Sequence, residues 1–129
     1  NTLIKISKSL IKKYKINKKN ILGHSDIAPL RKIDPGEKFP WKILHKKKIG
    51  VWYNISSEKT KILRGKISNL KFNKFINALK KIGYNIKSSN PKQRRKIVKA
   101  FQMRFRPELT DGKIDLECYK IAKSLTNHK

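Results

Sequence analysis

Apolar residues recur at intervals of three and four in the first fifteen positions of the chain, and lysines occupy most of the remaining positions. This spacing predicts an amphipathic helix over residues 2 to 15. Its apolar stripe consists of Leu3, Ile6, Leu10 and Tyr14. Ile21 and Leu22 then form a short apolar run, which we interpret as a buried strand that leads into the following loop.

Helical spacing returns from about residue 67 and predicts three further helices. The first ends at Gly83, a residue type typical of the position after a helix. The second opens with Asn90 before a proline, and Gln93 completes a capping box. The third follows Asp115, which we expect to cap it. Residues 54 to 66 lack this periodicity and are rich in Ser, Thr and Lys, which predicts a linker.

The candidate functional residues lie in residues 23 to 41, which read GHSDIAPLRKIDPGEKFPW. His24 and Asp34 carry nitrogen and oxygen donors of the kinds that zinc accepts, whereas a catalytic zinc site has three protein ligands and one open position. We assign only these two residues of the stretch as candidate ligands. From the residues alone, a surface turn with a solvated histidine and ordinary charges remains an alternative.

This string resembles the second signature of the zinc-dependent N-acetylmuramoyl-L-alanine amidases, which cut the bond between muramic acid and the peptide stem of peptidoglycan. The family pattern is G-H-x-D-I-A-P-x-R-K-x-D-P-G-x-x-F-x-W, and every specified position matches. The resemblance implies that His24 and Asp34 are two of three zinc ligands. It also implies that Lys32 steadies the oxyanion of the tetrahedral intermediate.

The sequence departs from the family in its first 23 residues. The family has a first histidine ligand and a catalytic glutamate upstream of the signature, and the residues before His24 contain no His, Glu or Asp. His45 and His128 are the other histidines, and nothing in the sequence supports either as a substitute. We therefore expect the C-terminal part of a longer amidase, with weak zinc binding and little or no activity by itself.

A second resemblance covers the helical segments after the linker. It rests on residues 94 to 107, which read RRKIVKAFQMRFRP, on Gly83-Tyr84 before them, and on residues 111 to 115, DGKID, after them. Together they resemble the three-helix peptidoglycan-binding module found in one branch of the same amidases. From the periodicity alone, a plain helical bundle without a ligand is the alternative.

These resemblances imply a fold of two parts. Residues 1–53 are expected to form an α/β remnant of a mixed-sheet amidase domain, residues 54–66 a linker, and residues 67–127 a small all-α three-helix module. The implied partner is peptidoglycan, and the implied location is the periplasm or cell envelope of a bacterium. A peptidoglycan-binding module without catalysis is the second function we consider. No oligomeric state is predicted.

Charge changes this picture little. The formal net charge is +26, with 34 basic residues, which by itself is compatible with nucleic-acid binding. The charge is spread along the chain and only six of the basic residues are arginines, the type that phosphate contacts favour. We therefore predict no specific nucleic-acid partner. No apolar run is long enough to span a membrane, and the single cysteine, Cys118, excludes an intramolecular disulfide.

Overall fold

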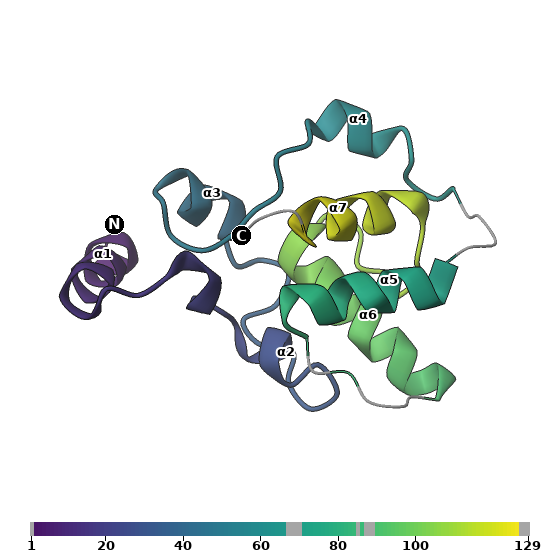
Figure 1. The fold of residues 1–129 in the computed structure, drawn as a ribbon, viewed down its shortest axis with the longest axis horizontal. Coiled ribbons are helices and arrows are strands. Elements are labelled where there is room, and N and C mark those ends of the chain that lie inside the picture. The colour runs from purple at the N-terminus through teal and green to yellow at the C-terminus, as the bar shows by residue number, and fades with distance from the viewer. Residues whose placement is uncertain (1, 67–70, 85, 87–89, 127–129) are drawn as a thin grey trace.

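The structure is a computed structural model that describes residues 2–66, 71–84, 86 and 90–126 (Figure 1). Within these ranges every regular element is a helix. In chain order the elements are α1 (Thr2–Tyr14), the 3-10 turn η1 (Lys18–Asn20), α2 (His24–Ile27), α3 (Trp41–Lys46), α4 (Ser57–Lys61), α5 (Lys71–Ile82), α6 (Pro91–Phe105) and α7 (Leu116–Thr126).

The expectation of an α/β remnant with a mixed sheet is wrong for the described residues, which contain no strand. Ile21, placed in a strand by the sequence, instead donates its backbone N–H to Lys18 O and closes η1. A strand requires a neighbouring strand to pair its N–H and C=O groups. A run of two apolar residues without such a neighbour leaves the chain extended but unpaired, and His24 follows as the first residue of α2.

The helices expected in the second half are present, and their predicted caps are confirmed. Asn90 Oδ1 accepts from the Gln93 N–H at 2.9 Å, and Gln93 Oε1 accepts from the Asn90 N–H at 3.1 Å, so the capping box of α6 is complete. Asp115 Oδ1 accepts from the Cys118 N–H at 2.9 Å at the start of α7. Figure 1 shows α5, α6 and α7 grouped together. The buried rings of Phe75 in α5 and Phe101 in α6 are in edge-to-face contact.

One hydrophobic core joins these helices to the segment before α4. Trp41, Leu44, Ile49 and Trp52 belong to the same buried cluster as Phe75, Phe101 and Phe105. The Trp52 and Phe105 rings are 5.8 Å apart. The expected linker contains α4, and the Lys66 carbonyl accepts from the Leu116 N–H. The division at residues 54–66 and the peptidoglycan-binding role of residues 67–127 stay predictions.

A buried ionic network holds the turn between α6 and α7. Arg106 is fully buried, and its Nη1 donates to Asp115 Oδ2 at 2.5 Å and to Glu117 Oε1 at 3.2 Å. Arg64 donates from Nε to the same Glu117 oxygen at 2.7 Å. Because both carboxylates are almost completely buried, each depends on these partners to offset the loss of water.

Helix α1 lies at the edge of the molecule (Figure 1). None of its residues is buried, and only Ile4 and Ile11 pack partly against the core. Its predicted apolar stripe is exposed, with exposed fractions of 41% for Leu3 and 62% for Tyr14. Among the described residues, no helix is both long enough and apolar enough to cross a membrane.

Candidate metal centre

Backbone hydrogen bonds fold residues 23 to 35 into a closed loop. Gly23 precedes α2, and its N–H donates to Asp26 Oδ2 at 2.9 Å. The Ser25 N–H donates to Asp34 O at 3.0 Å, which ties the start of α2 to the far end of the loop. The Lys32 N–H donates to Ala28 O. The predicted site residues, ten positions apart in the chain, are therefore held at the two ends of a short ring of backbone contacts.

The structure brings His24 and Asp34 into direct contact. His24 Nδ1 and Asp34 Oδ2 are 2.5 Å apart, and the two side chains are 69% and 57% exposed. The hydrogen bond from His24 lowers the pKa of the Asp34 carboxyl, and the charges of His24 and Lys32 lower it further. Lys32 is exposed, and its ammonium is close enough to act on Asp34 electrostatically.

The chemistry of this donor pair fits zinc, because an imidazole nitrogen and a carboxylate oxygen are both common zinc ligands. Two atoms bound to one zinc ion at about 2.1 Å and a tetrahedral angle lie roughly 3.4 Å apart. The present separation of 2.5 Å is that of a hydrogen bond, so the two atoms would have to move apart by slightly less than 1 Å. Both side chains are exposed enough to rotate by that amount.

A third ligand is not found among the described residues. No group of three or more His, Cys, Asp or Glu side chains converges there in a way that could hold a metal ion. His45 is on α3, and its Nδ1 lies 3.2 Å from Gly50 O instead of beside the loop. His128 lies outside the described residues. The described residues therefore offer two of the three ligands that a catalytic zinc site uses.

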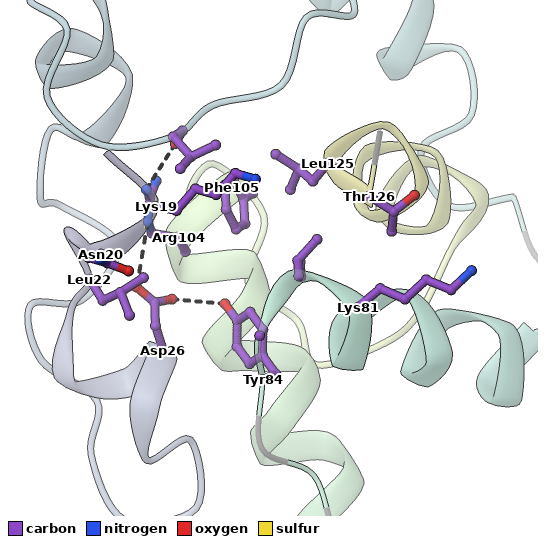
Figure 2. Close-up of a pocket in the computed structure, with 13 residues that line it drawn as sticks. Lys19, Asn20, Leu22, Asp26, Lys81, Tyr84, Arg104, Phe105, Leu125 and Thr126 are labelled. Atoms are coloured by element: carbon purple, nitrogen blue, oxygen red, sulfur yellow. Dashed lines mark hydrogen bonds and ion pairs between the residues drawn. The ribbon is translucent and has the colours of Figure 1, made fainter. Parts of the chain in front are cut away.

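A buried polar cluster lies beneath the loop, and sequence reasoning missed it. Figure 2 shows Asp26 between Arg104 of α6 and Tyr84, which follows α5. Tyr84 Oη donates to Asp26 Oδ1 at 2.8 Å, and Arg104 Nε is 3.6 Å from Asp26 Oδ2. The available signal was Arg104 itself, a charged residue three positions after Phe101 and therefore on the apolar face of α6.

Burial governs the ionisation of this cluster. Desolvation raises the pKa of the Tyr84 hydroxyl well above its ordinary value, and the Asp26 charge raises it further. Desolvation also lowers the pKa of Arg104, although the Asp26 charge acts in the opposite direction. The three side chains line a cavity of about 360 Å³ between the loop and the helices (Figure 2).

Known proteins resemble this chain over almost its full length. It is 36% identical over 126 residues to the N-acetylmuramoyl-L-alanine amidase AmiD of Escherichia coli, a match that covers 95% of this chain and 45% of AmiD. The structure of AmiD in complex with anhydro-N-acetylmuramic acid-L-Ala-D-gamma-Glu-L-Lys superposes with a TM-score of 0.84 at 35% identity, over 95% of this chain and 49% of that one. The chain is homologous to the N-acetylmuramoyl-L-alanine amidases.

Two further amidase homologues agree with this assignment. The crystal structure of AmpDh3 from Pseudomonas aeruginosa matches with a TM-score of 0.80 and 34% identity, over 95% of this chain and 50% of that one. The 1,6-anhydro-N-acetylmuramyl-L-alanine amidase AmpD of Enterobacter cloacae is 49% identical over 43 residues, which is 33% of this chain and 23% of that protein. No protein-family model matches the sequence. The chain spans about half the length of AmiD.

Proposed function

We propose that this chain supplies part of the active site of a peptidoglycan amidase that hydrolyses the bond between N-acetylmuramic acid and L-alanine. The contact between His24 and Asp34 carries the proposal, because it brings together two zinc-type donors on the loop whose residues match the amidase signature. The homology to AmiD over 95% of this chain supports it. Such an enzyme would act on peptidoglycan in the periplasm or cell envelope.

The loop residues would have different roles in the reaction. His24 and Asp34 would hold the metal, and zinc bound there would supply Lewis-acid chemistry. Lys32 carries its ammonium within electrostatic range of Asp34 and is exposed, so it can approach a substrate carbonyl. As charge develops on that carbonyl oxygen, a nearby cation stabilises the transition state more than the ground state.

Zinc titration of the 129-residue chain tests this proposal. Competition with a chromophoric chelator should reveal one weak zinc site, because two protein ligands hold the ion less firmly than three. His24→Ala and Asp34→Ala should each abolish the site. His45→Ala is the matched control, because that imidazole contacts Gly50 O and should leave the affinity unchanged.

Two results would contradict the proposal. The first is equal zinc affinity in the wild-type chain and in His24→Ala. The second is measurable release of stem peptide from purified peptidoglycan by the His24→Ala variant. The chain alone is expected to release little or none, because the described residues offer only two metal ligands.

A further inference from the structure

Arg104 connects helix α6 to the candidate metal loop, although about 70 residues separate them in the sequence. Its side chain is 3% exposed, and its guanidinium carbon lies 3.8 Å from the centroid of the Trp41 ring. Its Nη2 donates to Val51 O at 2.9 Å, while Nη1 is buried without a hydrogen-bond partner among the described residues. A buried cation with an incomplete set of partners is costly, so its contacts with Trp41, Val51 and Asp26 must offset part of that cost.

Two sets of contacts connect Arg104 to the loop, and the first set involves Trp41. The same indole lies beside Gly23, where a Cβ atom would lie 3.5 Å from Trp41 Cζ2 and only 2.5 Å from Pro35 Cδ. Gly23 precedes His24, and Pro35 follows Asp34. The Trp41 ring therefore lies beside the point where the two ends of the loop meet, and the Arg104 guanidinium lies against the same ring.

The second set of contacts involves Asp26. Its Oδ2 accepts from the Gly23 N–H and faces Arg104 Nε, while its Oδ1 accepts from Tyr84 Oη. Figure 2 shows Asp26 held from both sides by these two residues. Both sets of contacts end at Gly23, next to His24. Because Asp26 is 6% exposed, little water is available to replace either partner.

We propose that Arg104 and Tyr84 are positioning residues that set the spacing of His24 and Asp34. The helices α5, α6 and α7 would then help to build the metal site, in addition to any contact they make with peptidoglycan. This inference rests on the proposed function, because a spacing of metal ligands matters only if a metal binds. Arginine suits the position, since its planar guanidinium can stack on an indole and donate sideways at the same time, which a lysine ammonium cannot.

Amide hydrogen exchange measured by NMR on the 129-residue chain tests the inference without a metal. The probe is the Ser25 N–H, which is buried and bonds to Asp34 O across the loop. Arg104→Lys and Tyr84→Phe should each accelerate Ser25 exchange by about tenfold or more relative to the amides of α7, because local opening of the loop becomes easier. Ile121→Val is the matched control: Ile121 is fully buried in α7, so this variant should accelerate all core amides alike.

Zinc affinity, measured on the same proteins, distinguishes failure of the proposed metal site from failure of the proposed positioning role. The expected result is that Arg104→Lys and Tyr84→Phe weaken zinc binding about tenfold, because a loop that opens more easily holds His24 and Asp34 less often at a separation that one ion can bridge. If Ser25 exchange accelerates but the wild-type chain binds no zinc, the metal assignment fails while the connection to the loop stands. If Ser25 exchange relative to α7 is unchanged in both variants, the positioning role is overturned, whatever the zinc result. Tyr84→Phe keeps the ring in place, so the test survives if Arg104→Lys does not fold.

Discussion

Replacing Gly23 with alanine should disrupt the loop that carries the two candidate metal ligands. The backbone at Gly23 has φ −88°, which alanine adopts without strain, so the effect comes from the added methyl group alone. That methyl would lie 2.5 Å from Pro35 Cδ, whereas ordinary contacts begin at 3.4 Å. Pro35 or the start of α2 must therefore shift by about 0.9 Å, and Trp41 Cζ2, 3.5 Å from the same methyl, leaves little free space beside it.

A displacement of about 0.9 Å is large compared with the range of donor–acceptor distances over which a hydrogen bond persists. The Ser25 N–H to Asp34 O distance of 3.0 Å would grow beyond the range of a hydrogen bond. Overpacking of a close-packed site costs about 1–3 kcal/mol of the free energy of unfolding. Loss of the hydrogen bond that closes the loop would let the backbones of His24 and Asp34 vary in separation. Fewer molecules would then hold the two donors at a zinc-binding distance, so zinc affinity should fall by about tenfold or more.

The assay combines urea denaturation, followed by tryptophan fluorescence, with chelator competition for zinc. Ile33→Ala is the matched control, because Ile33 is on the same loop and 77% exposed. Its free energy of unfolding should stay within about 0.5 kcal/mol of the wild type. If Gly23→Ala matches Ile33→Ala in both measurements, the loop tolerates a methyl group and the proposed contact between Gly23 and Pro35 does not constrain the site.

Two further predictions concern the buried network and the loop carboxylate. Arg106→Met should lower the free energy of unfolding by roughly 3–5 kcal/mol, because it leaves the Asp115 carboxylate buried without its charged partner. The control is Lys96→Met on the exposed face of α6, which should change the free energy of unfolding by less than about 0.5 kcal/mol in the same urea assay. Equal losses would contradict this account. The pKa of Asp34 is lowered in the folded chain, so the stabilisation from its contact with His24 is present above the unfolded pKa of 3.8 and is lost as the pH falls through the lower folded value. In His24→Ala, a carboxyl NMR titration should show the Asp34 pKa returning toward 3.8, and an unchanged pKa would mean that the two side chains do not pair in solution.

Local rules were sufficient to predict the helices of the second half. The capping box at Asn90 and Gln93 and the cap at Asp115 depend on residues only three positions apart, so their partners are readable in the sequence. The contact of His24 with Asp34 was expected only through the family resemblance. Nothing in the spacing of the two residues specifies it, because a loop containing two prolines can close in several ways.

Contacts between distant segments explain what the sequence could not predict. Arg104 lies in an apolar stripe, and its partners Asp26 and Val51 come from parts of the chain that no local pattern connects to α6. The predicted strand at Ile21 failed for a related reason. A strand depends on a neighbour supplied from elsewhere in the chain, and within the described residues none pairs with this segment.

The loop that matches the amidase signature has an exposed face and a buried face, and each face restricts different residues. Together the two faces account for the length of the matching string. His24 and Asp34 are exposed and carry the candidate chemistry, whereas Asp26 and Trp41 point into the protein and contact Arg104 of α6. A loop that only bound a metal would constrain its ligands and the turns between them. A loop that also packs against a helical unit must satisfy a buried carboxylate and a buried ring at fixed places. The motif therefore connects the loop to α6 in addition to carrying the candidate ligands. On the proposed positioning role, substitutions at Arg104 of α6 are expected to alter the candidate site.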